Sequence, residues 1–357
     1  MTRAPKFERQ RGVAVITALL LTALAITIVA SLFWQQQVLV RSMENQRLHL
    51  QTKWILLGGI DFSRFFLHED ALSPIGRTVT ILDGILNTPL AETRLDDYVE
   101  REQVEGEKFD ATLSGQISDA QARFNLTNLA LNRIVDQAQV LAFGRLLQNL
   151  RLDPSLAQAV ANAIAQTQSA TSAPPTTTAA ATTAAPPAGS AAAPVATAPM
   201  AAPVASSGGS EPMGFVYVED LLSVPGFTPQ AVAVLRDFVV VLPAATFVTP
   251  AASVNVNTAP AEVLAAVAGI SVSEAAALTL SRQHTYFTMS NMESRLKRST
   301  TFLLAVKSSY FLVSSRVRLD RAALDAQALI YRPDQLSQMT TSNLPMKTTT
   351  PVWIREN

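Results

Sequence analysis

The stretch RGVAVITALLLTALAITIVASLFW, residues 11–34, decides the fold class of this chain. From Val13 to Trp34 it carries no charged residue. At about 1.5 Å of rise per residue, a helix of this length spans roughly the 30 Å of a bilayer core. Residues 1–11 carry four basic side chains against one acidic one, and a positive flank of this kind stays on the cytoplasmic side. We therefore expect a transmembrane helix over residues 13–40, with the bulk of the chain on the other side of the membrane.

The junction before the apolar run distinguishes three interpretations of this helix. An ordinary secretory signal needs a shorter apolar core and a small-x-small cleavage site, whereas this run continues into Gln35–Gln37 without a helix breaker. A plain single-pass anchor fits the hydropathy equally well. The order of charge, glycine and apolar run at Arg11-Gly12-Val13 resembles a type III, prepilin-type signal, which a prepilin peptidase cleaves after the glycine. That resemblance implies a leader over residues 1–12, cleavage between Gly12 and Val13, and methylation of Val13 as the new N-terminus.

The composition disfavours several classes of function. The chain of 357 residues balances 28 basic against 28 acidic side chains, has no cysteine, and has three histidines, His49, His68 and His284. The lack of cysteine excludes disulfides, thiolate metal sites and cysteine nucleophiles. A neutral balance argues against nucleic acid as a partner, because phosphate binding needs a clustered cationic surface. We find no phosphate-binding loop, G-x-S-x-G elbow or metal motif, which disfavours a membrane-anchored hydrolase, so we expect no enzymatic activity.

A helical continuation is predicted over residues 41–70. Leu50, Trp54 and Leu57 lie on one face at helical spacing, and Ile55, Phe62 and Phe66 widen that face. We expect that face of the helix to pack into the core of a soluble domain.

Period-two alternation predicts strands near both ends of the soluble part. Residues 107–118 alternate loosely, and residues 308–319 alternate strictly. A turn at Asp320-Arg321 then leads into a second apolar segment through 329–331, which predicts an antiparallel hairpin. The tail over 334–357 is rich in Thr, Pro and Ser, and we expect it to be flexible.

The middle of the chain predicts helices and one low-complexity insert. Residues 128–166 predict two helices, and residues 254–264 (VNVNTAPAEVL) open another, with Thr258 as a plausible N-cap. Of the 42 residues from 169 to 210, 39 are Ala, Pro, Thr, Ser or Gly, so this insert cannot bury enough apolar surface to order itself. The helical hairpins resemble modules that hold DNA, but residues 211–282 carry two basic and six acidic side chains, which oppose that use.

Four blocks of the sequence together resemble the minor pseudopilin K family of bacterial type II secretion (general secretion pathway protein K). They are the junction 11–13 with its apolar helix, residues 119–126 (DAQARFNL), residues 254–264, and residues 310–313 (YFLV) with the hairpin that follows. Most pilins and pseudopilins carry Glu five residues into the mature chain, where it is thought to pair with the terminal amine of a neighbouring subunit. Thr17 stands at that position here, and lack of this Glu distinguishes the K family.

The resemblance implies an α+β pseudopilin fold. A long N-terminal transmembrane helix would pack on an antiparallel sheet, with a large all-α domain inserted between strands. The implied divisions of the soluble part are a first pseudopilin portion at 41–119, the inserted domain at 120–300 with its disordered insert at 169–210, and C-terminal strands at 301–333.

The resemblance also implies a non-enzymatic structural subunit at the tip of the type II secretion pseudopilus. The partners would be the minor pseudopilins I and J, the major pseudopilin and the prepilin peptidase. The chain would sit in the bacterial inner membrane, with its soluble part in the periplasm. The alternative is a minor pilin of a type IV pilus-like system with an adhesive or DNA-handling role.

Calcium sites known in some relatives are not expected here. Hard cations need several oxygen ligands, preferably carboxylates. The corresponding place in this chain reads ANAIAQTQ over residues 161–168 and offers no carboxylate. We therefore predict no metal and no other cofactor.

Overall fold

The computed structural model describes residues 11–81, 89–95, 110–168, 214–243, 252–296, 304–334 and 349–356, and it divides into two compact units. The first unit comprises Met1–Ser73, Leu82–Ser118 and Phe311–Asn357, and the second comprises Pro74–Ile81 and Asp119–Tyr310. The second unit is thus inserted between strands, and it includes a short segment after the first helix that the sequence did not assign to it. The predicted insert at 169–210 and most of the predicted leader lie outside the described residues.

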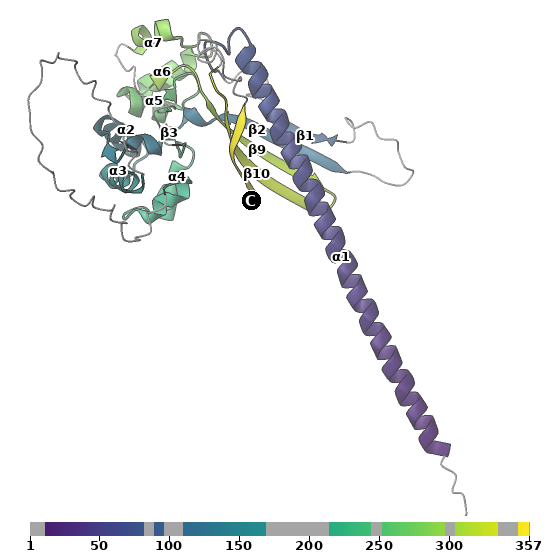
Figure 1. Ribbon diagram of the computed structural model, residues 1–357. Helices are drawn as coiled ribbons and strands as arrows, with labels where there is room; N and C mark the ends of the chain where they lie inside the picture. Colours follow the sequence, from purple (N-terminus) through teal and green to yellow (C-terminus); the bar gives the residue numbers. More distant parts are fainter. Residues whose placement is uncertain are drawn as a thin grey trace, which may run out of the picture. The chain divides into compact units, whose positions relative to one another are not determined.

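The first unit is built on one helix of 62 residues, α1 (Arg11–Leu72), which is drawn in purple in Figure 1. Its N-terminal part is long and apolar enough to cross a membrane, and its side chains from Ala14 to Val40 are exposed. Threonine hydroxyls within this part donate to the backbone carbonyl three residues earlier; Thr22 and Thr27 do so at 2.9 and 2.8 Å. These internal bonds allow hydroxyl side chains to lie in an apolar helix.

A five-stranded sheet completes the described part of the first unit, in the order β1-β2-β9-β10-β11. The strands are β1 (Leu90–Arg94), β2 (Ala111–Asp119), β9 (Tyr310–Leu319), β10 (Ala322–Tyr331) and β11 (Thr350–Glu356). The predicted β9–β10 hairpin is confirmed, and its turn places Asp320 at a positive φ of 49°. Buried and exposed positions alternate along β9, as period two requires.

The face of α1 that packs on this sheet is mostly not the one predicted, although Ile55 packs there as expected. Leu56, Ile60 and Leu67 are buried against apolar side chains of β9 and β10, whereas Leu50 and Trp54 are exposed. The soluble half of α1 is apolar on more than one side, so periodicity alone could not select the buried side. Close approach selects it: a Cβ atom on Gly59 would lie 3.2 Å from the Leu113 side chain of β2.

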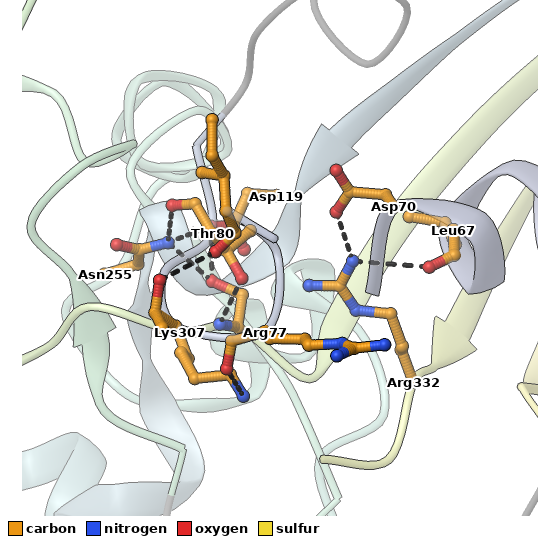
Figure 2. Close-up of polar contacts among 11 residues, drawn as sticks. Leu67, Asp70, Arg77, Thr80, Asp119, Asn255, Lys307 and Arg332 are labelled. Atoms are coloured by element: carbon orange, nitrogen blue, oxygen red, sulfur yellow. Dashed lines mark hydrogen bonds and ion pairs between the residues drawn. The ribbon is translucent and has the colours of Figure 1, made fainter. Parts of the chain in front are cut away.

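A buried arginine fixes the C-terminal end of α1. Arg332, directly after β10, donates to the Asp70 carboxylate at 2.6 Å and to the Leu67 carbonyl at 3.4 Å, as Figure 2 shows. Its guanidinium also lies 4.4 Å from the centroid of the Phe311 ring. Leu67 and Asp70 belong to the last turns of the helix, where carbonyl groups need donors and a cation is favoured.

The tail predicted to be flexible contains a strand. Residues 350–356 form β11 at the sheet edge, and Lys53 of α1 makes an ion pair with Glu356 at 2.6 Å. No residue of β11 is fully buried, so the strand lacks the apolar alternation that identifies a strand in sequence. Pro351 has no N–H to donate, and it is tolerated because a position on an edge strand does not need that donor on its open side.

The second unit is mainly helical. Its described helices are α2 (Gln137–Asn149), α3 (Leu156–Thr167), α4 (Pro229–Leu235), α5 (Ala261–Ala268), α6 (Val272–Ser281) and α7 (Met289–Leu296), with short 3-10 turns η3 (Ala120–Ala122), η4 (Leu126–Leu129) and η5 (Val218–Ser223). The two predicted helices are α2 and α3. Residues before α2 form a tight hairpin instead, because Asn132 and Arg133 both take positive φ.

Short strand pairs, two of which join distant parts of the chain, show that this second unit is not purely α-helical. In the described residues, β3 (Phe124–Asn125) pairs with β6 (Val239–Val240), β4 (Ala130–Leu131) with β5 (Ile134–Val135), and β7 (Val254–Asn255) with β8 (Leu304–Ala305). A single apolar core lies among the helices, with the rings of Phe124 and Phe143 stacked at 5.3 Å.

Two adjacent glycines of α1 provide a matched test of its packing. Gly59→Leu should destabilise the first unit by about 1–3 kcal/mol, because the added side chain meets Leu113. Gly58→Leu should stabilise it by up to about 1 kcal/mol, since nothing lies within 4 Å of a Cβ atom there and leucine favours the helix. Thermal unfolding of the detergent-solubilised chain measures both, and equal effects would contradict the assigned helix face.

Candidate functional site

The two most distinctive motifs of the sequence meet in one buried network of the second unit. We call this network the polar junction and define it by Thr80, Asp119, Asn255, Thr258 and Ser308. Its members come from four segments that are far apart along the chain. Figure 2 shows the Asp119 carboxylate among these segments.

The carboxylate of Asp119 is the acceptor at the centre of the junction. It is 2% exposed, and within the described residues it accepts hydrogen bonds from four neutral groups. The donors are Ser308 Oγ at 2.5 Å, Thr258 Oγ1 at 2.6 Å, the Gln121 backbone N–H at 2.8 Å and Asn255 Nδ2 at 3.0 Å. Burial raises the pKa of Asp119, and these hydrogen bonds oppose that rise.

The Asn255 side chain adds the Thr80 segment, which Asp119 does not reach, and makes a second contact with Ser308. Its Nδ2 also contacts the Thr80 carbonyl at 3.0 Å and Ser308 Oγ at 2.8 Å, and its Oδ1 accepts from the Asn257 N–H at 3.0 Å. The Ser308 N–H donates in turn to Thr80 Oγ1 at 3.0 Å. An unpaired polar group at this depth would cost roughly 1–3 kcal/mol, so each bond matters for stability.

Other polar residues of the two motifs also form hydrogen bonds with distant segments of the chain. Gln121 accepts from the Ser309 N–H at 2.6 Å and donates to the Ser253 carbonyl at 2.8 Å. Asn257 exchanges two hydrogen bonds with the backbone of Phe287, at 2.7 and 2.9 Å. The polar side chains of the two motifs therefore hold together segments in the interior of the domain.

Asn125 begins a formal glycosylation sequon, but its side chain forms hydrogen bonds in the interior of the domain. It is buried, and its Oδ1 accepts from the Leu242 N–H at 3.0 Å and from Thr127. A side chain in this position is not available to a glycosylation enzyme in the folded protein.

The chemistry of the junction is structural. Asp119 is out of contact with solvent and already fully engaged, so it does not face a substrate. Across the described ranges, no group of three or more His, Asp or Glu side chains could hold a metal ion.

The residues predicted as the cleavage site and as the missing-Glu position lie near the N-terminus, in α1. Gly12 and Val13 fall in the first turn of the helix, and their cleavage and methylation remain predictions. Thr17 is exposed, and its hydroxyl donates to the Ala14 carbonyl at 3.0 Å. Because a threonine hydroxyl is uncharged, this position presents no charge to a neighbouring subunit.

An exposed apolar surface, part of which the sequence analysis assigned to the core, runs along the soluble half of α1. Leu50, Trp54, Phe62 and Phe65 are between 54% and 72% exposed. At 3.6 residues per turn these four lie within an arc of about 120°, with Gly58 among them. We call this surface the α1 stripe. Exposed apolar patches of this kind mark interaction sites.

The apolar N-terminal helix, packed through its soluble half on an antiparallel sheet, defines a pseudopilin with a mainly helical domain inserted between its strands. Two family models, both described as type II secretion system (T2SS) protein K, match residues 122–244 and 254–300. Over these residues the chain is similar to the type II secretion system protein K family.

Individual relatives agree with this assignment. The type II secretion system protein K of Pectobacterium carotovorum subsp. carotovorum is 27% identical over 356 residues, covering 93% of this chain and 95% of that protein. The Pseudomonas aeruginosa protein of the same name is 31% identical over 169 residues, so this alignment spans about half of each, 46% of this chain and 47% of that protein.

A solved structure shows the same fold. It is the GspK-GspI-GspJ complex of the enterotoxigenic Escherichia coli type 2 secretion system, and one of its chains aligns with a TM-score of 0.54 at 13% identity. The alignment covers 88% of this chain and 99% of that chain.

Adjacent serines test the junction. Ser308→Ala removes a donor from Asp119 and an acceptor from Asn255, and it should destabilise the second unit by about 1–3 kcal/mol. Ser309→Ala removes a hydroxyl outside the junction and should stay within about 0.5 kcal/mol. Urea unfolding measures both variants, and equal losses would show that the junction contributes nothing specific.

Proposed function

We propose that this minor pseudopilin acts at the tip of the type II secretion pseudopilus, as a non-enzymatic subunit that assembles with pseudopilins I and J. Its helix α1 anchors it in the inner membrane, and its soluble part lies in the periplasm, where it supports export of folded proteins. The observation that carries the proposal is the α1 stripe. The solved complex supports the choice of partners, because it contains GspK together with GspI and GspJ.

The α1 stripe favours a helical partner. Burying one large apolar side chain contributes roughly 1.5–3 kcal/mol, so four exposed ones in a soluble segment represent a substantial driving force for association. Gly58 leaves open space in the middle of the stripe. A glycine at such a place allows the backbone of a second helix to approach closely.

Thr17 supports a place at the end of the filament. Its hydroxyl cannot neutralise the terminal amine of a subunit beneath it, and an unpaired buried charge costs several kcal/mol by order of magnitude. The amine of this chain remains available to the Glu of another subunit. A subunit that carries the Glu can therefore pair with the terminal amine of this chain, whereas Thr17 disfavours pairing with the terminal amine of another subunit.

Charged substitutions in the α1 stripe test the assembly surface. Leu50→Lys and Trp54→Lys should each weaken co-assembly with subunits I and J by about tenfold or more, because each places an unpaired charge in an apolar interface. Leu141→Lys, on an equally exposed leucine of α2, is the matched control and should leave co-assembly unchanged. Pull-down from detergent extracts measures the loss. Retention of wild-type assembly by both stripe variants would contradict the surface.

Processing of the N-terminus tests the membrane part of the proposal. Mass spectrometry of the extracted protein should find a methylated Val13 at the N-terminus. Gly12→Val should block this cleavage, because the peptidase accepts a small residue there, while Gly58→Val in the same helix should be processed normally. An intact leader on the wild-type chain would refute the predicted processing.

A further inference from the structure

A hollow in the first unit lies beside the α1 stripe, between α1 and the strands β1, β2 and β9. We call it the α1 groove. Its volume is about 650 Å³, whereas about 150 Å³ is enough to admit a benzene ring, so the groove has room for more than one large side chain. The large apolar residues that line it are Phe62, Phe66, Leu90, Leu113, Ile117 and Val313.

Two glycines on facing elements explain why this space is not filled. Gly59 of α1 and Gly115 of β2 both line the groove. Because side chains alternate along a strand, Gly115 shares a face with Leu113 and Ile117 and interrupts their apolar row. A Cβ atom on Gly115 would lie 3.0 Å from the Ser314 carbonyl oxygen of β9. The close approach of β9 therefore requires a glycine here, and the gap in the apolar row remains.

The α1 groove is uncharged. Among the described residues, those that line it include no Asp, Glu, Lys, Arg or His, and its polar members are Ser, Thr and Gln. One of them, Ser63, uses its hydroxyl within α1, where it donates to the Gly59 carbonyl at 2.9 Å. A charged group that entered the groove would lose water without gaining an opposite charge. The groove therefore fits neutral, apolar groups.

Phe62 makes the groove continuous with the α1 stripe. Its side chain is 54% exposed, belongs to the stripe and also lines the groove. The Phe62 ring meets the Phe66 ring edge to face, with the ring centroids 4.5 Å apart. At 100° per residue, Phe66 and Gly59 follow Phe62 directly around the helix. A second helix that packs along the stripe thus brings the side chains at its own edge to the mouth of the groove.

We propose that the α1 groove is the anchor pocket for the pseudopilin that packs along the α1 stripe, and that neutral apolar side chains from one helix of that subunit enter it. This inference rests on the proposed function, and it adds β1 and β2 to the surface that the partner covers. Residues three or four apart on a helix point to the same side, so neighbouring anchors can share one groove. Desolvated pockets of this kind hold the side chains that dominate binding at an interface.

A charge placed in the groove from β1, away from α1, tests this assignment. Leu90→Glu should weaken co-assembly with subunits I and J by about tenfold or more, because its carboxylate would be buried without a partner. Leu90→Met keeps an apolar side chain and should retain co-assembly. Leu131→Glu is the matched control, since this leucine of β4 is 45% exposed against 43% for Leu90, and it should assemble like the wild-type chain. Pull-down from detergent extracts measures all three variants.

Thiol labelling measures the occupancy of the groove directly. The chain has no cysteine, so Ala91→Cys places a single thiol at the groove, and Leu131→Cys places a single thiol on the control strand. In the complex with I and J, alkylation at position 91 should slow by about tenfold or more, because a thiol must be accessible to react. Alkylation at position 131 should keep its rate.

The outcomes separate the groove from the proposed function. If Leu90→Glu assembles like the wild-type chain, or if the Ala91→Cys thiol stays equally reactive in the complex, the groove is not the anchor, although the proposed function stands. Protection of that thiol in the absence of I and J would mean that detergent or lipid fills the groove, which also overturns the inference. A wild-type chain that fails to co-assemble with I and J removes the proposed function, and the anchor pocket with it.

Discussion

A carboxylate taken out of water without a cation beside it must receive hydrogen bonds from its surroundings, and the second unit of this protein is organised around that requirement. Asp119 stands where the chain leaves the sheet, and Ser308 stands 189 residues later, just before the chain returns to it. Their hydrogen bond holds together the two ends of the long segment between them. Closing a loop of this length costs conformational entropy. Asn255 and Thr258 add bonds from the middle of the loop, so entry, middle and exit are held by one acceptor.

This organisation explains what the two most distinctive motifs of the sequence do in the folded domain. Residues 119–126 and 254–264 are rich in Asn, Asp and Gln, a composition that at first suggests binding or catalysis. The structure assigns these side chains to backbone groups of distant segments. We propose that interaction with other subunits uses the α1 stripe instead, whose side chains are apolar.

The sequence predicted those parts of the fold that local physics determines. The apolar length of residues 13–34 predicted the membrane helix, and strict alternation predicted the hairpin of β9 and β10. The buried face of α1 could not be predicted, because both of its sides are apolar and the sheet that selects between them comes later in the chain. Strand β11 and the polar junction escaped prediction for a related reason: the strand shows no apolar alternation, and the junction depends on contacts between residues more than 130 positions apart.

The central claim is that Asp119 and its donors act as one unit. A double-mutant cycle between Asp119→Ala and Ser308→Ala, read by urea unfolding of the second unit, tests it most directly. Because the two side chains share a hydrogen bond, the cycle should give an interaction energy above about 0.5 kcal/mol, while the pair Asp119→Ala and Ser309→Ala should be additive. Additivity of Asp119→Ala and Ser308→Ala would contradict the account.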